Sequence, residues 1–447
     1  MRPTILMGAF LSKNHLKRIG SFHAPPNESC KRQKTSSGVW YDEPRLIPGL
    51  PDEISLQILA RTPRIGYLNL KAVSPSWRAA VTSPEIYNIR KELGTTEEWL
   101  YILVNKGLFG RFLHALDPIS KRWQRLPPIP NALVEIGYRR SLSCFRTVYR
   151  SCAFAAVDGC LYMLGGVSGC SSLTSVWKYD PVSNSWIEAN PMSVGRAYFE
   201  TGVLNNKLFV VGGISFSRVG DNHYSKTPLQ SAEVFDPETG LWSDIPSMPC
   251  SKAHATAFLG GSQNPVTIGL ASYRGKLYVP QSFLRLPFFA DVGGEVYDPE
   301  TNSWVDMPTV MGEDWPPRIW GTKPSVILDG DLYAMDPIYS LEGALEGGKV
   351  YVYNHPDDSW IVVEGYVPLR NHSPYILTGL LGKLHVVTID DNDNMVVMRG
   401  DKRDDSTASL DEGDSESVTT SESYIWNVIA SRNFRLGRLE GCQNLDI

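Results

Sequence analysis

The chain has 447 residues, of which 42% are hydrophobic and 20% charged, and its formal net charge is −5. This composition allows a sizeable buried core and excludes a wholly disordered chain, while the negative balance argues against a general nucleic-acid-binding protein. The 12 Trp, 20 Tyr, 38 Gly and 31 Pro residues favour many short strands and turns over long helices.

The cysteines and the apolar runs restrict where the protein is expected to work. Seven cysteines are present, an odd number with no CxxC pair, which argues against both a disulfide framework and a zinc site. Free thiols of a reducing compartment are the simpler interpretation. No apolar run approaches the ~18 residues that a membrane helix needs. We therefore expect a protein of the cytoplasm, the nucleus or both, without membrane contact.

The first segment, residues 1–45, contains eight Lys or Arg and three Asp or Glu without apolar periodicity. This pattern predicts a disordered basic tail. The basic run from Lys31 to Lys34 is compatible with a nuclear localisation signal. A plain solvated tail is the alternative, and the sequence leaves both open.

A small helical module is expected over residues 46–94. Pro51, followed by two acidic residues, suits the first turn of a helix, and the apolar stripe behind it ends at Pro63. A second short apolar segment follows, and Pro75 and Pro84 begin two further short helices. So few residues make a marginal core, so we expect the module to rely on its neighbour and on a partner.

The order of the sequence pieces in this module resembles an F-box. The matching pieces are Leu-Pro-Asp-Glu (50–53), Ile-Leu-Ala-Arg (58–61), Val-Ser (73–74), Trp-Arg (77–78) and Ser-Pro-Glu (83–85). The resemblance implies docking to a Skp-type adaptor and, through it, to a cullin ubiquitin ligase. The adaptor contacts that it implies fall on Leu50, Pro51, Ile54, Ile58, Leu59 and Val73. For Ile54 and Leu59, packing inside the module is the alternative.

The remainder of the chain is repetitive. Its Trp landmarks lie 56 to 66 residues apart, at Trp123, Trp186, Trp242, Trp304, Trp360 and Trp426. The first five follow an Asp or Asn by six residues, and turn residues such as Asp-Gly and Asn-Asn precede apolar strands in the units. Each unit therefore predicts a four-stranded antiparallel blade. A closed ring of six blades, a mainly β fold, would remove the exposed blade edges.

The order of a glycine doublet, Tyr-Asp-Pro and Trp resembles kelch repeats over residues 99–447. It is clearest in the second and third units, which carry Gly165-Gly166 and Gly212-Gly213. The fourth and fifth units have other residues in place of the doublet, and the sixth lacks Asp-Pro. The resemblance implies a six-bladed kelch-type β-propeller whose repeated Gly, Tyr and Trp are structural. Together with the F-box-like module, the chain resembles the plant F-box/kelch-repeat proteins.

The first unit lacks its inner strand, because Trp99–Val104 matches the second strand of the other units. Counting from Trp426 by the spacing of the third unit places the missing strand at residues 440–447. Because strands alternate in direction, the F-box entry and this C-terminal strand share one face of the ring. The opposite face, which we call the open face, is formed by the second-to-third and fourth-to-first connections.

Three long loops are expected on the open face, at Ile214–Gln230, Pro280–Val292 and Pro308–Pro324. The last contains Trp315, Arg318 and Trp320, the composition of a recognition hot spot, and these are the candidate target-binding residues. Packing of Trp315 or Trp320 on a neighbouring blade is the alternative. A further segment, residues 401–423, holds eight acids and two bases and predicts a disordered acidic insert in blade six.

The family resemblance implies a non-catalytic substrate-recognition subunit of a Skp-cullin-F-box ubiquitin ligase. The F-box would dock the adaptor, and the propeller would capture a target protein for ubiquitination. A kelch scaffold without ligase activity and a kelch-fold enzyme are the alternatives. No His pair has close metal-ligand spacing, and no nucleophile or phosphate-binding motif is present. We therefore expect no catalytic residue, metal or cofactor.

Overall fold

The structure is a computed structural model, and it describes most of the chain. The described residues are 45–106, 110–129, 152–168, 171–219, 223–249, 266–267, 269–285, 288–315, 323–339, 345–370, 373–403, 423–435 and 437–447. The expected basic tail therefore lies outside the described residues, except for Arg45. Residues 53–447 form one compact unit.

Four short helices and a 3-10 turn form the N-terminal module: α1 (Asp52–Ala60), η1 (Arg64–Gly66), α2 (Tyr67–Val73), α3 (Pro75–Val81) and α4 (Pro84–Glu92). The sequence explains where they begin. The hydroxyl oxygen of Ser74 accepts a hydrogen bond from the Trp77 backbone N–H, and Ser83 caps α4 in the same way through Ile86. A proline occupies the first turn of both α3 and α4. No helix in the described residues is long and apolar enough to cross a membrane.

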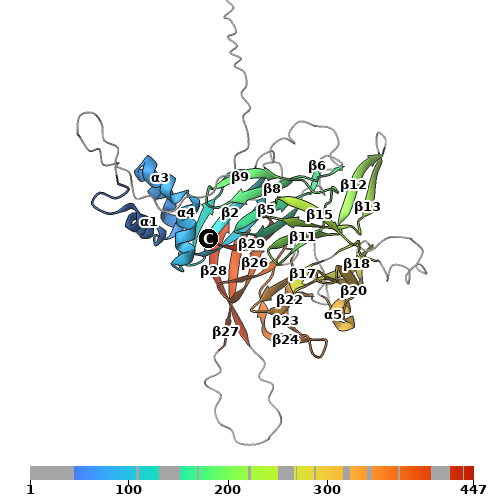
Figure 1. Cartoon of the computed structure of the whole chain (residues 1–447). Coiled ribbons are helices and arrows are strands. Elements are labelled where there is room, and N and C mark those ends of the chain that lie inside the picture. Colours follow the sequence, from blue (N-terminus) through green and yellow to red (C-terminus); the bar gives the residue numbers. More distant parts are fainter. Residues whose placement is uncertain are drawn as a thin grey trace, which may run out of the picture. The chain divides into compact units, whose positions relative to one another are not determined.

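Six antiparallel sheets follow, and each is a propeller blade (Figure 1). Blade one contains β29 (Arg438–Asp446), β1 (Glu98–Asn105), β2 (Arg111–Asp117) and β3 (Arg122–Arg125). Blade two contains β4 (Ala153–Val157), β5 (Cys160–Leu164), β8 (Val176–Asp180) and β9 (Ser185–Ala189). Blade three contains β10 (Glu200–Leu204), β11 (Lys207–Val211), β14 (Ala232–Asp236) and β15 (Leu241–Ile245).

The other three blades complete the ring. Blade four contains β16 (Val266–Thr267) and β17 (Ala271–Tyr273), both paired with β18 (Lys276–Arg285), then β19 (Phe288–Asp298) and β20 (Ser303–Asp306). Blade five contains β21 (Ser325–Leu328), β22 (Asp331–Tyr339), β23 (Leu345–Asn354) and β24 (Ser359–Val367). Blade six contains β25 (Ile376–Leu380), β26 (Lys383–Ile389), β27 (Asn394–Lys402) and β28 (Tyr424–Asn433).

The C-terminal strand closes the ring. β29 pairs antiparallel with β1, with Trp99 opposite Leu445 and Leu103 opposite Gly441, which agrees with the position reached by counting from Trp426. The inner strands then contact one another in the order β29, β4, β10, β17, β21, β25 and back to β29. Figure 1 shows the C-terminal end beside α4, where the Tyr87 hydroxyl donates to the Asp446 carbonyl at 3.5 Å. The blades therefore have no open seam at blade one.

The repeated Trp residues of blades two, three and four tie each of these blades to the one before it. The indole N–H of Trp186 donates to the Pro127 carbonyl at 3.2 Å, and that of Trp242 donates to the Asn190 carbonyl at 2.8 Å. Trp304 repeats the bond with the Pro246 carbonyl at 2.6 Å. In all three cases the acceptor follows the outer strand of the preceding blade. The doublet glycines are equally structural, since Gly165 has a φ of +59° and a Cβ there would lie 2.4 Å from the Arg196 carbonyl oxygen.

Two of the three expected open-face loops contain strands. Ile214–Gln230 contains a hairpin of β12 (Ile214–Val219) and β13 (His223–Pro228), and Pro280–Val292 belongs largely to the extended β18–β19 hairpin. Pairing satisfies backbone groups that an irregular loop would leave to water. A smaller hairpin in blade two has β6 (Val167–Ser168) and β7 (Ser171–Ser172), and the third loop begins with α5 (Thr309–Glu313).

The acidic insert begins later than the sequence pattern predicts. Asp401 and Lys402 are the last residues of β27, where they pair with Ile425 and Tyr424 of β28. The Asp401 carboxylate lies 2.8 Å from the Lys383 ammonium and 2.8 Å from the Arg399 guanidinium. Hydrogen bonding to Arg399 is the main cause that lowers the pKa of Asp401 to about 2. Asp401 is therefore part of the blade, and residues 404–422 lie outside the described residues.

Candidate functional site

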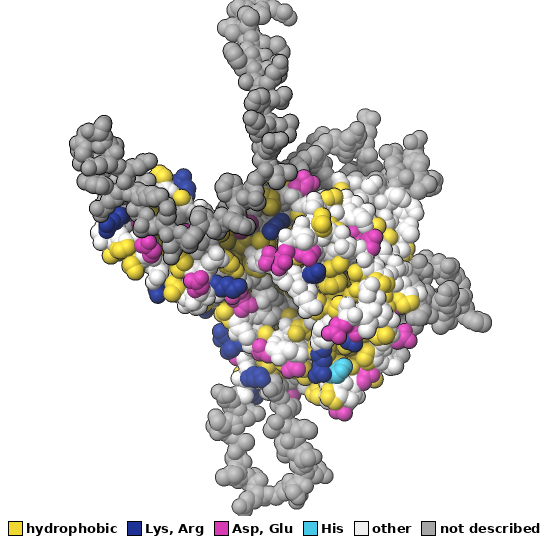
Figure 2. Space-filling model, in the orientation of Figure 1, with side chains coloured by type: hydrophobic (Ala, Val, Ile, Leu, Met, Phe, Trp, Pro, Cys, Tyr) yellow, Lys and Arg dark blue, Asp and Glu magenta, His cyan; other side chains and the backbone are white. Residues whose placement is uncertain are grey.

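The helical module exposes large apolar side chains from two helices. Ile54 and Ile58 of α1 are each 44% exposed, and Leu68 and Val73 of α2 are 55% and 59% exposed. Apolar side chains are visible at the surface of the module in Figure 2. Several large apolar side chains left in water on so small a module are typical of a protein-docking surface.

Helix α1 has an inner and an outer side, and the sequence stripe is divided between them. Ser55, Leu59 and Ala60 are buried, whereas Ile54 and Ile58, four residues apart, are on the outer side. Leu59 is 1% exposed, so the expectation that it contacts an adaptor is wrong and its role is packing inside the module.

Three other expected adaptor residues keep some exposure. Pro51 and Val73 are exposed, and Leu50 is half-buried. The sequence pattern did not single out Leu68, which is as exposed as Val73 on α2. The signal was present, because Leu68 belongs to the apolar segment that predicts this helix, but no feature of that segment says which of its residues face water.

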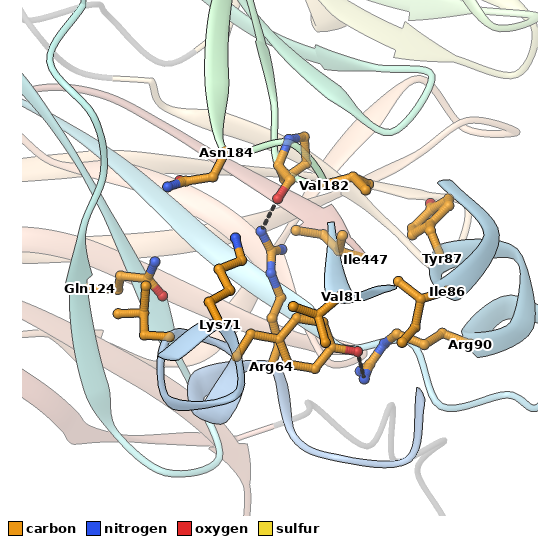
Figure 3. Close-up of a pocket in the computed structure, with 13 residues that line it drawn as sticks. Arg64, Lys71, Val81, Ile86, Tyr87, Arg90, Gln124, Val182, Asn184 and Ile447 are labelled. Atoms are coloured by element: carbon orange, nitrogen blue, oxygen red, sulfur yellow. Dashed lines mark hydrogen bonds between the residues drawn. The ribbon is translucent and has the colours of Figure 1, made fainter. Parts of the chain in front are cut away.

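A dense polar junction fixes the helical module on the propeller (Figure 3). The Arg64 guanidinium donates to the Tyr101 hydroxyl at 3.0 Å and to the Pro181 carbonyl, in the turn between β8 and β9, at 2.8 Å. It also lies 5.2 Å from the centre of the Trp99 ring. The Arg64 backbone N–H donates to the Glu97 carboxylate at 3.0 Å. One residue of the module thus contacts two blades.

A second arginine supports the junction from within the module. Arg90 of α4 is buried, donates to the carbonyls of Ala60 and Thr62, and lies 2.8 Å from the Glu97 carboxylate. The pocket between the module and the propeller, drawn in Figure 3, has a volume of about 40 Å³. That is room for very few water molecules. Burial and then the charges of Arg64 and Arg78 lower the pKa of Lys71, which lines this pocket.

The candidate target-binding residues lie differently from the expectation. Trp315 is 1% exposed and packs edge-on against Trp360 of blade five, with ring centres 6.0 Å apart. The expectation that Trp315 is an exposed recognition residue is therefore wrong, and the alternative of packing on a neighbouring blade holds. Arg318 and Trp320 lie outside the described residues.

The inner strands line an open cavity of about 300 Å³ at the axis of the ring. Its lining is made of small, polar and aliphatic residues from β4, β10, β17, β21 and β29, including Ser272, Ser325 and Asn444. Lys323, which precedes β21 at the open-face end, is the one charged residue among the described residues that line it. The described lining offers hydrogen-bonding groups, such as Ser272, Ser325 and Asn444.

Two histidines and three cysteines of the described chain are buried or half-buried. Burial is the main cause that lowers the pKa of His114 and of His385 to about 4, so both rings are neutral at pH 7. Burial raises the pKa of the Cys152 and Cys160 thiols to about 11 and that of Cys442 to about 12, so none is a thiolate nucleophile. Within the described part of the chain no group of three His, Cys, Asp or Glu residues could hold a metal ion.

The comparisons with known proteins agree with both halves of the architecture. Residues 47–89 match the F-box domain, and residues 149–193 and 195–249 match the Kelch motif. The F-box/kelch-repeat protein At1g22040 of Arabidopsis thaliana is 46% identical, over 94% of this chain and 95% of its own length. F-box/kelch-repeat protein At1g30090 of the same plant is 30% identical, over 60% of this chain and 61% of its own. The solved structure of YjhT aligns with a TM-score of 0.43 and 16% identity, covering 66% of this chain and 89% of that one.

Proposed function

Because the chain belongs to the plant F-box/kelch-repeat family, we propose that it is the target-recognition subunit of a Skp-cullin-F-box ubiquitin ligase. An F-box joined to a kelch propeller indicates a substrate-adaptor protein. In this role the chain performs no chemistry of its own. It binds a Skp-type adaptor, and through it a cullin, while the propeller holds the protein that is to be ubiquitinated.

One observation supports the proposal above the others: the module leaves Ile54, Ile58 and Val73 in water, while Ser55, Leu59 and Ala60 of α1 are buried. Burying such side chains in a partner is worth roughly 1.5–3 kcal/mol each, so a few of them suffice for a stable contact. Leu50 and Pro51, which precede α1 in the sequence, stay predicted adaptor contacts.

The contacts between the helical module and the propeller suit this role. Ubiquitin transfer requires that a lysine of the target reach a distant active centre, so target and adaptor must be held in a defined relation. Arg64 contacts Tyr101 of blade one and Pro181 of blade two, and the pocket beside it is small. We infer that the joint acts as a stiff connection between adaptor and target.

The test is adaptor binding by the full chain with Ile54→Ala and Ile58→Ala together. We expect the double variant to lose at least about tenfold in affinity for a purified Skp-type adaptor, because two exposed anchors are truncated. The propeller should melt as in the unmodified chain. The matched control is Ile119→Ala, which removes an apolar side chain that is 74% exposed on a turn of blade one.

Two results would contradict the proposal. One is equal adaptor binding by the double variant and the unmodified chain. The other is no adaptor binding by the unmodified chain, which would favour a kelch scaffold without ligase activity.

A further inference from the structure

Five basic residues gather at the open-face ends of blades one and six. Lys106 follows β1, Arg111 begins β2, Arg125 ends β3, and Arg432 and Arg435 lie at and just beyond the end of β28. We call these five residues the basic cluster. They are far apart in the sequence, and they meet because β29 closes blade one against blade six.

The charges of the basic cluster are largely uncompensated. Arg111 lies 2.6 Å from the Glu440 carboxylate. In the described part of the chain, no acidic side chain pairs with the other four. Partial burial, followed by the charges of Arg125, Arg432 and Arg435, lowers the pKa of Lys106. Four cations thus repel one another on a chain whose net charge is −5.

Aromatic rings hold three of these cations, Lys106, Arg125 and Arg432, in place. Phe112 has the Lys106 ammonium 5.4 Å and the Arg125 guanidinium 4.5 Å from its ring centre. The Arg432 guanidinium lies 5.5 Å from the centre of the Phe434 ring. Phe434 is itself fixed edge-on by Trp123 at 5.5 Å. Cation–π contacts of this kind restrict long side chains before any partner arrives, which lowers the entropy cost of binding.

Resting on the proposed function, we propose that the basic cluster is where the propeller docks an acidic, Asp- and Glu-rich segment of its target protein. Carboxylates would supply the counter-charges that the described part of the chain does not provide here, and Arg is the side chain best suited to hold them in pairs of hydrogen bonds. The cluster is on the face away from the module, because the module contacts the β8–β9 turn and the C-terminal end of β29, which lie at the other ends of the strands. A target bound at the cluster therefore leaves the adaptor side free.

The aromatic rings beside the basic cluster also indicate which residues, besides Asp and Glu, the acidic target segment should contain. Phe112 is half-buried beside the cations. An acidic segment with interspersed aliphatic side chains would use both the charges and the ring surface. Electrostatic complementarity of this kind accelerates association and weakens as salt rises.

The experiment measures binding of fluorescein-labelled peptides to the full chain by fluorescence anisotropy. The probe alternates Glu with Leu and Gly, and the reference peptide has Gln in place of every Glu. We expect the Glu peptide to bind at least about tenfold more tightly than the Gln peptide at low salt, and the difference to shrink as salt is raised.

Variants assign the binding to the cluster. Arg125→Gln and Arg432→Gln should each weaken binding of the Glu peptide about fivefold or more, and Arg125→Lys should retain most of it. Arg122→Gln is the matched control, because Arg122 is an exposed arginine on the same strand, β3, at the end that faces the module side. It removes the same charge and should leave affinity unchanged.

Three outcomes would overturn the inference: no preference for the Glu peptide, equal loss with Arg122→Gln and Arg125→Gln, or tighter binding of a single-stranded oligonucleotide that depends on the same arginines. Adaptor binding is measured on the same protein. Retained adaptor binding with any of these outcomes removes the acidic-segment inference alone. Lost adaptor binding with a normal peptide result removes the ligase role and leaves the docking site in place.

Discussion

Trp315 illustrates how a residue that looks functional in sequence becomes structural in the fold. It lies in the core shared by blades four and five, with Tyr273, Met311 and Tyr353 in the same cluster. An aromatic side chain that is 1% exposed contributes through the surface it buries and not through contact with a partner.

We therefore predict that Trp315→Ala lowers the free energy of unfolding by about 3–5 kcal/mol, because it leaves a large cavity between two blades. Thermal melting followed by circular dichroism would show a clear decrease in melting temperature, and Trp315→Phe should recover much of it. An unchanged melting temperature together with lost target binding would restore Trp315 as a recognition residue.

The apolar residues of α1 show what spacing in the sequence can and cannot predict. Ile54, Ile58 and Leu59 are apolar at helical spacing, and that spacing correctly indicates α1. It does not say which side of α1 meets the rest of the fold. Ile58 and Leu59 are neighbours in sequence, yet they are 44% and 1% exposed. Side chains at consecutive positions point about 100° apart, so only the tertiary packing decides between contact and core.

At the scale of elements, local chemistry predicts most of the helices and strands. Ser74 and Ser83 before prolines mark where α3 and α4 begin, and the six Trp landmarks all fall on the outer strands of blades. The separate β12–β13 hairpin beside blade three and the extended β18–β19 hairpin of blade four were expected to be loops. Their strands continue beyond the pattern of the other repeats, and that pairing depends on the opposite strand rather than on local spacing.

Two strands carry buried histidines that make the stability of the fold depend on pH. His114 of β2 is 4% exposed and His385 of β26 is 1% exposed. Burial is the first cause that lowers the pKa of each from 6.5 to about 4. Between pH 6.5 and pH 4 the unfolded chain binds protons that the folded chain does not, so stability falls as the pH falls.

We predict a loss of roughly 2–3 kcal/mol per histidine on going from pH 7 to pH 4, present in full only near the lower value. Urea unfolding at a series of pH values would measure the slope. His114→Gln together with His385→Gln should flatten the decline between pH 6.5 and pH 4.5, whatever its effect on stability at pH 7. Parallel curves for the double variant and the unmodified chain would contradict this assignment.

At the scale of the whole molecule, ring closure creates features that no local pattern contains. Lys106, Arg125 and Arg432 are separated by up to hundreds of residues, and they form one basic cluster because blades one and six are neighbours. The sequence predicted the ring and its faces from repeat counting. It did not predict the cluster, because that step requires knowing which strand ends of different blades meet. Cations at the open-face ends of strands in the first and last repeats were the signal available.

The C-terminal strand β29 is also expected to keep the propeller folded and soluble. Eight residues, 440–447, supply most of β29, which pairs with β1 along its length and contacts the inner strands of blades two and six. Their removal would leave β1 unpaired on its inner edge and would expose Trp99, Leu103 and the core beneath them, an edge prone to aggregation. We predict that a chain of residues 1–439 is aggregated or is cut rapidly by trypsin.

The matched control is deletion of residues 404–422, which lie between the paired strands β27 and β28 and outside the ladder that joins them. This control should leave the melting temperature and adaptor binding unchanged. A soluble 1–439 chain that melts cooperatively at the unmodified temperature would mean that blade one is closed by another segment.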